Sequence, residues 1–390
     1  MKVLMISLDK SFFDEKKSDD VVERHHHYSV LINGNLDIIV LNKNKSFSVK
    51  HITDKLTVYP TNSFSVFSYV FSALKISRHL FNIYKLRKPY SLVVTQDPFI
   101  TGLIGYLIKY KYKIPLLINC HGDFFGNSYW LKENKRNYLL LILAHFLIKR
   151  CDGIRVVNRL TKLKLIQDQK INSDKIEVIP MPVNLKLFQR QANPALKLKK
   201  FEKTIREIYL LFVGRLVKVK NIPLLLKAFK KILNNHPKVK LIIIGQGPQK
   251  RYCQKLAYSL SIYQHIEWIG WIPYKSLCNY YFKADIVILP SFSESFGRVL
   301  VEAGACGKPV VASMTTGAKE VIKNKKTGLL FPINDEESLV RALNYLIIHP
   351  EKRRKMGESA YHYIHSRFDY DKTIKQTIIF WQRIANLETE

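Results

Sequence analysis

Two glutamates stand eight positions apart in the stretch SFSESFGRVLVEAGACGKPV, which spans residues 291–310. Glu294 and Glu302 could form a catalytic acid–base pair, hold the two ends of a ligand, or be ordinary helix charges. Paired glycosidase carboxylates lie roughly 5 to 9.5 Å apart, whereas eight residues of helix rise about 12 Å. This spacing favours one elongated ligand, with sugar hydroxyls at Glu294 and ribose hydroxyls at Glu302. Taken alone, Glu302 would be interpreted as a solvated helix charge.

The residues between the two glutamates suit a phosphate. A strand is expected to end near Pro290, and a helix is expected to run over residues 297–306. The backbone amides of Ser295, Phe296 and Gly297 would then face a diphosphate at the start of that helix. Gly297 would also let the backbone approach the ligand closely.

A second loop, in FVGRLVKVKN, carries positive charge. We expect a strand to end before the turn at Gly214 and a helix to start near Asn221, which suits the N-cap. Arg215 and Lys220 then lie near the positive end of a helix dipole. An anion there would gain from both side chains and from free amides. The alternative is that both residues are solvated loop charges in a lysine-rich chain.

Short apolar runs that alternate with stretches of helical length must position these loops. In the first half of the chain, runs of strand length occupy residues 2–7, 36–41, 90–96, 113–120, 152–158 and 176–181. In the second half they are IYLLFVG, KLIIIGQG, HIEWIG, ADIVILP, KPVVAS and GLLFP. Such alternation predicts an α/β fold with two doubly wound, Rossmann-like domains and a cleft between them. Ligands of such sheets bind beyond the carboxyl ends of the strands.

The predicted domain boundaries follow the composition. Residues 1–185 form the first domain, the polar and lysine-rich segment 186–207 a linker, and residues 208–367 the second domain. Residues 368–390 are expected to form an amphipathic helix that packs back toward the first domain.

Bulk composition narrows the class of protein. The chain has 390 residues, and no apolar run in it is long enough to cross a bilayer. The opening MKVLMISLDKS is better interpreted as a buried strand than as a signal peptide. Five scattered cysteines predict reduced thiols in the cytoplasm, with no disulfide framework and no metal site.

The net charge of +32 raises the question of a polyanionic partner. The excess is spread evenly over the chain, as compositional bias would give, yet residues 61–150 hold 13 basic and only 3 acidic side chains. Within that range, ALKISRHLFNIYKLRKPY and GLIGYLIKYKYK interleave Lys and Arg with aromatic and aliphatic residues. This pattern suits a helix face resting on anionic lipid headgroups. It would also suit nucleic acid, but no recognition motif accompanies it.

Several motifs together resemble one family. A glycine turn with Arg and Lys, the GQGP turn at 245–248, E-S-F-G-x4-E followed by G-K-P-V, and TTGAKEVIKNKKTGLLF at 315–331 recur in order. This resembles the family 4 glycosyltransferases, which are retaining enzymes of the GT-B fold. The resemblance is strong over residues 208–335 and fainter in the first half, at VVTQDPFITGLIGY and INCHGDFF.

The resemblance implies a role for each matching residue. Glu294 would orient the donor sugar, Glu302 would hold the donor ribose, and the Phe296–Gly297 backbone would contact sugar and phosphate. Arg215 and Lys220 would neutralise the diphosphate leaving group in place of a divalent metal. The further matches are His121, which would face the donor sugar from the first domain, and Trp271 and Ile272, which would contact the base. His121 could otherwise be a hydrogen-bonded structural histidine.

Three features depart from the family or imitate other sites. The family has a glycine-rich loop after its first strand, but SLDKSFFDEKKSDD contains no glycine. The consecutive histidines at 25–27 point in different directions on a helix and make a poor metal site. Asp369 and Asp371 imitate a metal-binding D-x-D, but they stand at a helix start, where acids are favoured.

The sequence therefore predicts a cytoplasmic, metal-independent retaining hexosyltransferase. The basic, aromatic helices add the expectation of a peripheral location on the inner face of the cell membrane. The enzyme would use a UDP-sugar or GDP-sugar donor and a lipid-linked or cell-envelope polysaccharide acceptor, without nucleic acid. The alternatives are a non-catalytic nucleotide-sugar binder, an epimerase or phosphorylase of the same fold, and, more remotely, a basic nucleic-acid-binding protein.

Overall fold

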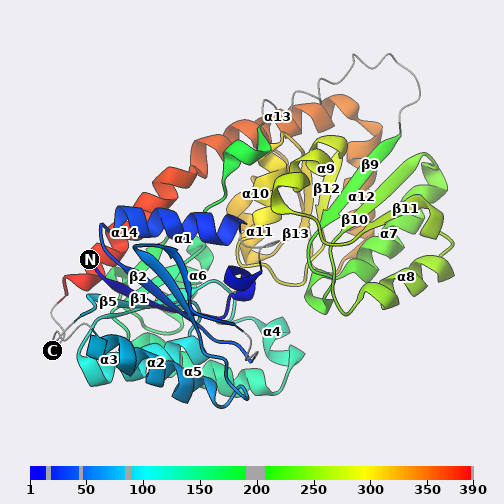
Figure 1. Ribbon diagram of the computed structural model, residues 1–390. Coiled ribbons are helices and arrows are strands. Elements are labelled where there is room, and N and C mark those ends of the chain that lie inside the picture. The colour runs from blue at the N-terminus through cyan, green and yellow to red at the C-terminus, as the bar shows by residue number, and fades with distance from the viewer. Residues whose placement is uncertain (15–18, 44–46, 84–88, 190–206, 388–390) are drawn as a thin grey trace. The chain divides into compact units, whose positions relative to one another are not determined.

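The computed structural model describes residues 1–14, 19–43, 47–83, 89–189 and 207–387. The chain divides into two compact units (Figure 1). The first unit comprises Met1–Pro180 together with Asp371–Glu390, and the second comprises Met181–Tyr370. The division after Pro180 stands in place of the predicted boundary at 185. Most of the predicted linker 186–207 lies outside the described residues.

The first unit contains an eight-stranded sheet in the order β3-β4-β2-β1-β5-β6-β7-β8. Its strands are β1 (Val3–Ser7), β2 (Leu36–Val40), β3 (Lys50–Thr53), β4 (Leu56–Pro60), β5 (Leu92–Thr95), β6 (Leu116–Cys120), β7 (Gly153–Val156) and β8 (Ile176–Val178). All neighbours pair in parallel except β3, which runs antiparallel to β4. The six strands predicted from apolar runs are confirmed.

Strands β3 and β4 were not predicted from the sequence. β3 is a half-exposed edge strand with the sequence KHIT, so it lacks the continuous apolar run that marks a strand covered on both faces. β4 is buried, but its run LTVYP is short and ends in proline. An edge strand of this kind takes its conformation from pairing with its neighbour.

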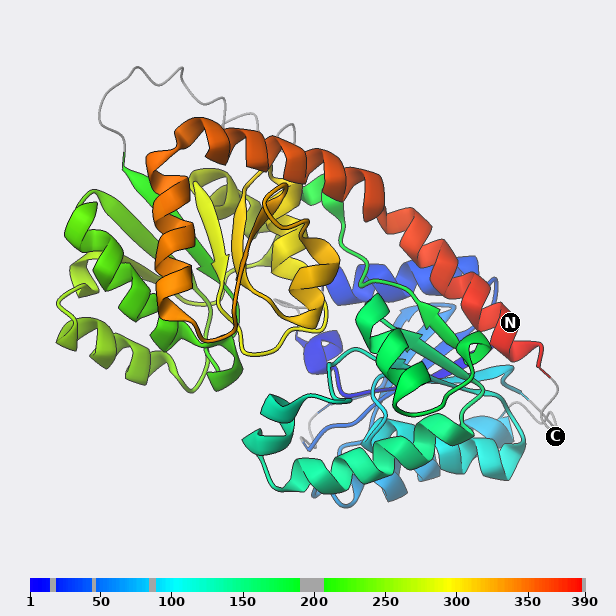
Figure 2. The same cartoon turned by 180° about the vertical axis from the view of Figure 1, so that it is seen from behind.

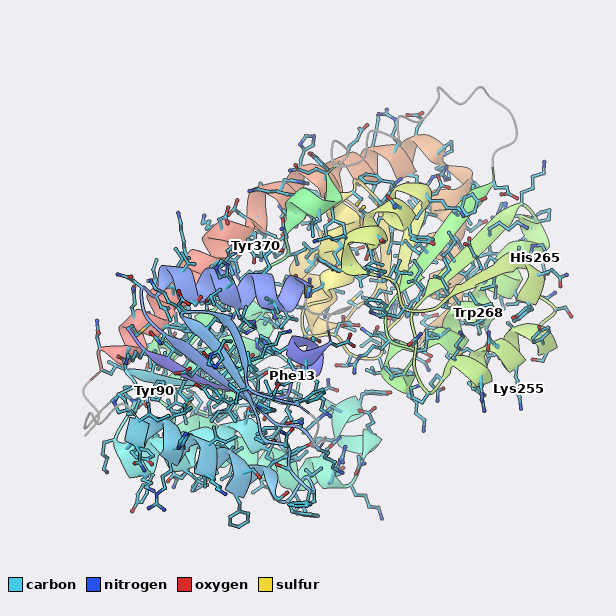
Figure 3. All side chains as sticks on the ribbon, in the orientation of Figure 1. Phe13, Tyr90, Lys255, His265, Trp268 and Tyr370 are labelled. Carbon is cyan, nitrogen blue, oxygen red and sulfur yellow. The ribbon has the colours of Figure 1, made fainter. Side chains whose placement is uncertain are left out.

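Helices cover both faces of the first sheet (Figures 1 and 2). One face carries α1 (Asp19–Leu31), α6 (Arg159–Gln167) and α14 (Tyr370–Ala385), and the other carries α2 (Tyr69–Ile83), α3 (Ile100–Tyr112) and α5 (Arg136–Arg150). A short helix, α4 (Ser128–Glu133), precedes α5. Just before β5, the buried Tyr90, labelled in Figure 3, donates its hydroxyl hydrogen to Asp37 of β2 at 2.7 Å.

The C-terminal helix α14 closes one face of the first sheet. Its predicted apolar stripe, Ile374, Ile378, Trp381 and Ile384, is buried, and the Trp381 ring lies 5.1 Å from that of Tyr28 in α1. The helix approaches β7 so closely that a Cβ added at Gly153 would lie 2.7 Å from Cγ1 of Ile384. The absence of a side chain at Gly153 therefore sets the distance between helix and sheet.

The three histidines of α1 lie in different environments, as their helical spacing indicates. His25 is buried, its Nδ1 lies 2.7 Å from the carbonyl oxygen of Val21, and its ring packs between those of Phe12 and Tyr28. Burial, and then the charge of Arg24, lower the pKa of His25 to about 3. His26 and His27 are half-buried. Among the described residues no group of three His, Cys, Asp or Glu side chains could hold a metal ion.

The second unit contains a six-stranded parallel sheet in the order β11-β10-β9-β12-β13-β14. Its strands are β9 (Ile208–Val213), β10 (Val239–Ile244), β11 (Ile266–Ile269), β12 (Ile286–Leu289), β13 (Val310–Ser313) and β14 (Gly328–Phe331). Its helices are α7 (Ile222–Asn235), α8 (Lys250–Ser259), α9 (Leu277–Lys283), α10 (Arg298–Ala305), α11 (Thr316–Val321), α12 (Glu336–Ile348) and α13 (Pro350–Arg367). All six strands predicted for the second half are confirmed, and so is the α/β class.

Across the described ranges, no helix is both long enough and apolar enough to span a membrane.

We predict that Gly153→Ala destabilises the first unit by about 1–3 kcal/mol, because the added methyl group overpacks Ile384. The double variant Gly153→Ala/Ile384→Ala should be more stable than the sum of the two single changes implies, by about 1 kcal/mol. Urea unfolding followed by circular dichroism measures both quantities. Gly270→Ala is the control, because its Cβ would meet only the Gln246 side chain at 3.3 Å. Strict additivity would show that the contact is not tight.

We predict that the free energy of unfolding falls as the pH drops from 7.5 to 5.5. The unfolded state protonates His25 below its ordinary pKa of 6.5, whereas the folded state keeps the ring neutral down to a pKa of about 3. The expected loss from this residue is about 1.4 kcal/mol. His25→Gln should remove that part of the pH dependence, as measured by urea titrations at both pH values. An unchanged difference between the two pH values would mean that His25 titrates normally.

Candidate functional site

Two loops meet at the carboxyl ends of β9 and β12, which are neighbours in the second sheet. The first loop, residues 214–221, follows β9, and the second, residues 290–297, follows β12. The amide of Phe292 donates to the carbonyl oxygen of Val219 at 2.8 Å and ties the two loops together. Residues that are far apart in sequence therefore share one edge of the sheet.

Lys220 and Glu294, both predicted as site residues, are in direct contact. The Lys220 ammonium donates to Oε1 of Glu294, and the Ser291 hydroxyl donates to the same oxygen at 2.8 Å. Both charged side chains are largely buried, and Ser291 is fully buried. A cation and a carboxylate are thus held together at the start of the second loop, where each neutralises the other. Ser291 was not predicted, although its position three residues before Glu294 would allow this contact.

Arg215 lies in the first loop and is exposed. No carboxylate among the described residues pairs with it. The residue after it, Leu216, is bonded to the GQGP turn that follows β10. The Leu216 amide donates to the carbonyl oxygen of Gln246 at 2.8 Å, and the Leu216 carbonyl oxygen accepts from the amide of Gln249 at 2.9 Å. A Cβ at Gly247 would lie 2.3 Å from the Leu216 oxygen. Glycine is required there if Arg215 is to stay at this edge.

The backbone of Glu294 is held from the start of α11. Its carbonyl oxygen accepts from the amide of Gly317 at 2.7 Å and from the hydroxyl of Thr316 at 2.8 Å. A Cβ at Gly317 would lie 2.5 Å from the nitrogen of Phe296, so only glycine permits this approach. Neither Thr316 nor Gly317 was singled out as a site residue. The signal available was the TTGA motif directly after β13.

Helix α10 begins after Gly297, as predicted. Gly297 has φ 77, in the left-handed region that glycine adopts at little cost. The half-buried Ser295 precedes it, and the side chain of Phe296 is buried against Phe368, with ring centroids 5.7 Å apart. The backbone of 295–297 therefore lies directly before the first turn of α10, and the contact of its amides with a diphosphate stays a prediction.

Asn221 occupies the predicted N-cap position of α7, but the prediction that it caps the helix is wrong. It has φ 49, and its side chain makes no capping hydrogen bond. The residue also ends a 3₁₀ turn over Lys218–Lys220, and this forces the left-handed backbone that Asn tolerates. Its side-chain amide instead donates to Oδ1 of Asn334 at 3.1 Å.

Glu302 is buried in α10, with only 3% of its surface exposed, so it is not a solvated helix charge. It accepts hydrogen bonds from the hydroxyls of Tyr281 at 2.7 Å and Tyr274 at 3.1 Å, and Nε of Arg298 lies 3.8 Å away. Burial, and then the charge of Glu302, raise the pKa of Tyr281 well above its usual value. The two tyrosines were not predicted. They keep the carboxylate in a fixed orientation.

Trp271 and Ile272 follow β11 at the same edge of the sheet. Trp271 is exposed and Ile272 is half-buried. They lie directly before the turn Tyr274–Ser276, which supplies one of the hydroxyls on Glu302. An indole is a side chain that can stack on a planar ligand.

His121 belongs to the first unit, where it follows β6 directly. Its Nε2 lies 2.8 Å from Oε1 of Gln96, which follows β5. Burial, and then the charge of Arg155, lower the pKa of His121 to about 3, so the ring is neutral near pH 7. Gln96 was not predicted as a site residue, although it stands in the VVTQDPF motif. The pair lies at the carboxyl edge of the first sheet, where ligands of such sheets bind.

The predicted decoys are on other elements than these loops. Asp371 is in the first turn of α14, and Asp369 directly precedes that helix. All five cysteines are buried free thiols. The glycine-free segment after β1 forms a 3₁₀ turn, Lys10–Phe13, in which the Asp9 carboxylate caps the amide of Ser11 at 3.0 Å. Residues 15–18 of that segment lie outside the described residues.

Two protein families match the chain, one in each half. The family described as Glycosyltransferase Family 4 matches residues 33–187, and the family described as Glycosyl transferases group 1 matches residues 196–363. An uncharacterized glycosyltransferase of Methanocaldococcus jannaschii is 26% identical over 367 residues, which cover 90% of this chain and 91% of that protein.

Solved structures agree with the fold. Sucrose-phosphate synthase from Thermosynechococcus elongatus superposes with a TM-score of 0.82 at 20% identity, over 98% of this chain and 99% of that one. Anabaena HepE in complex with UDP and glucose superposes with a TM-score of 0.77 at 18% identity, over 98% of this chain and 100% of that one. With glycosyltransferase families matched in both halves and two parallel-sheet α/β units, the chain belongs to the family 4 glycosyltransferases of the GT-B fold and is a transferase of glycosyl groups.

Proposed function

We propose that this glycosyltransferase is a retaining, metal-independent hexosyltransferase that uses a nucleotide diphosphate sugar, a UDP-sugar or a GDP-sugar. Its acceptor is a lipid-linked or cell-envelope glycan. The enzyme works in the cytoplasm at the inner face of the cell membrane. A solved structure of the same fold, Anabaena HepE, holds UDP and glucose, which supports a nucleotide-sugar donor.

The observation that carries the proposal is the joining of the two loops in the second unit. Arg215, Lys220 and the amides of 295–297 are all at the carboxyl edge of β9 and β12. Glu294 is in the loop after β12 and Glu302 is in the helix that follows it, and each is fixed by its own hydrogen bonds. These cations and amides can bind an anion, and the two carboxylates can accept hydrogen bonds from the hydroxyls of a sugar and a ribose.

The cations of this site act on the leaving group. Breaking the anomeric C–O bond of the donor leaves its electron pair on the diphosphate oxygen, and negative charge grows there. Arg215 and Lys220 are positioned to bind that charge more strongly in the transition state than in the ground state. Because these residues carry fixed positive charge, they can supply the stabilisation that a divalent ion gives to other phosphate sites.

Donor binding changes the partners of Lys220. In the structure, the Lys220 ammonium is bonded to Glu294. A diphosphate at the loop offers Lys220 a stronger anion, and the released carboxylate can accept hydrogen bonds from hydroxyls of the hexose. Glu294 then orients the sugar, while Ser291 and the turn at Thr316 keep its side chain and backbone in place.

His121 and Glu302 both contribute as hydrogen-bond acceptors, because the one N–H of the neutral His121 ring is directed at Gln96. The neutral ring of His121 suits a hydrogen bond from a sugar hydroxyl and would not repel the positive charge that develops at the anomeric carbon. Glu302 would accept from the ribose hydroxyls, and the exposed Trp271 with Ile272 would contact the base. The acceptor hydroxyl oxygen bonds to the anomeric carbon on the face that the leaving group occupied, and its proton passes to the departing diphosphate oxygen, which gives retention.

We predict that a nucleoside diphosphate raises the melting temperature of the wild-type protein in the presence of EDTA. Thermal-shift titration with UDP, GDP, ADP, UDP-glucose, UDP-N-acetylglucosamine and GDP-mannose would identify the base. Arg215→Ala and Lys220→Ala should each weaken binding roughly 10- to 100-fold, because each removes a charge-assisted contact with phosphate. Lys218→Ala is the matched control, because this exposed lysine is in the same loop. If no nucleotide stabilises the protein, the proposed nucleotide-sugar donor site is wrong.

We predict that Glu294→Gln separates sugar recognition from nucleotide binding. The change removes the carboxylate that competes for Lys220, so affinity for the free diphosphate should be equal or higher. The extra stabilisation that the complete nucleotide sugar gives should fall, and transfer should drop at least about 100-fold. Calorimetric titration with UDP and with the preferred donor measures both effects. Equal loss of UDP and donor binding would mean that Glu294 only supports the fold of the loop.

A further inference from the structure

Helices α2, α3 and α5 form one layer on the first sheet, and their outer surface is unusually apolar. α3 packs against both of the other two helices (Figures 1 and 2). Their buried sides contribute to a single hydrophobic core with the sheet. We call the outward side of these three helices the three-helix face.

Helix α5 supplies the centre of the apolar stripe. Leu139, Ile142 and Phe146 recur at spacings of three and four residues, so they share one side of the helix. They are opposite the buried Asn137, Ala144, Leu147 and Ile148. Leu139 is 71% exposed and Ile142 is 67% exposed. Three large apolar side chains thus point away from the core on one helix.

The neighbouring helices continue the stripe. In α2, Phe71 is 77% exposed, on the side opposite the buried Tyr69 and Ala73. In α3, the half-exposed Tyr106 packs edge-on against Phe146 of α5, with ring centroids 5.4 Å apart, and Tyr110 is exposed one turn further on. The ring contact joins the two helices on their outer side. The exposed apolar side chains of α3 and α5 therefore form one patch, and Phe71 adds an exposed ring on the neighbouring helix α2.

The charge of this face has one sign. The 43 residues of the three helices (15, 13 and 15) contain no Asp or Glu. Seven cations lie on them: Lys75, Arg78, Lys109, Lys111, Arg136, Lys149 and Arg150. Lys109 is paired with Asp152, which follows α5, and the Arg150 guanidinium lies 3.8 Å above the Phe146 ring. Apolar side chains and cations thus alternate along three helices that carry no carboxylate of their own.

We propose that the three-helix face docks on an anionic lipid bilayer, with Phe71, Leu139, Ile142 and Phe146 entering the headgroup region and the cations contacting lipid phosphates. Charge complementarity selects this occupant. A second copy of the chain presenting the same face would place cations against cations, whereas anionic headgroups neutralise them. The proposal deepens the acceptor class of the proposed function and rests on it for its purpose. Lipid binding itself is measurable without any transferase reaction.

The test is co-sedimentation of the full chain with vesicles of phosphatidylcholine alone and of phosphatidylcholine with about 30% phosphatidylglycerol. Wild-type protein should bind the anionic vesicles. Leu139→Gln/Ile142→Gln should weaken binding at least about tenfold, because two large apolar side chains no longer enter the membrane. Lys149→Gln/Arg150→Gln should weaken it about fivefold for each cation removed, and by less at high salt.

The matched control is Ile348→Gln/Ile379→Gln, which exchanges two exposed isoleucines on α12 and α14, outside the three-helix face. It should bind vesicles like the wild type. Thermal shift with the preferred nucleoside diphosphate should be the same in all variants, which separates failure of this inference from failure of the proposed function. Analytical ultracentrifugation without lipid measures whether the wild type and each variant are monomers or dimers.

Three results would overturn the proposal: no binding of wild-type protein to anionic vesicles, equal loss of binding in the control variant, or a dimer that Leu139→Gln/Ile142→Gln converts to a monomer without any lipid binding. The last result would assign the face to a second copy of the chain.

Discussion

The parallel pairing of β9 with β12 is the constraint on which the candidate site depends. Because both strands run in the same direction, their carboxyl ends deliver two loops to one edge, and the bond from Phe292 to Val219 joins those loops. The glycines around this edge follow from the same constraint. Backbone segments approach so closely that a Cβ at Gly247 or Gly317 would overlap a neighbouring main chain. The rigid sheet is thus converted into fixed positions for a lysine and a glutamate.

Electroneutrality explains how the charged residues of the second unit can be largely buried. Lys220 and Glu294 neutralise each other. Separating such a pair leaves a buried charge without compensation unless another charged group takes the place of one member. Glu302 is satisfied differently, by two tyrosine hydroxyls and a more distant arginine. The first arrangement can exchange partners when an anion arrives. The second holds its carboxylate in one orientation.

The two helix layers that cover the first sheet differ in how they pack and in the side chains that they expose. One face is covered by α1, α6 and the C-terminal helix α14, whose approach depends on the missing side chain at Gly153. The other is covered by α2, α3 and α5, which leave aromatic and aliphatic side chains exposed beside cations and carry no acidic residue. Exposed apolar surface of this extent calls for a partner. The same unit places His121 and Gln96 at the carboxyl edge of its sheet.

The sequence alone determined the α/β class, twelve of the strands, the helix after Gly297 and the loops that carry Arg215, Lys220 and Glu294. It could do so because strands of a parallel sheet are buried on both faces and form continuous apolar runs, and because glycine marks tight turns locally. Only the tertiary structure decided the pairing of Lys220 with Glu294, the tyrosines on Glu302, the contact of Gln96 with His121 and the side-chain partner of Asn221. It also decided the edge strand β3 and its neighbour β4. The physical reason is the same in each case: the partner is distant in sequence, so the packing of the chain, and not the local residue pattern, brings the two groups together.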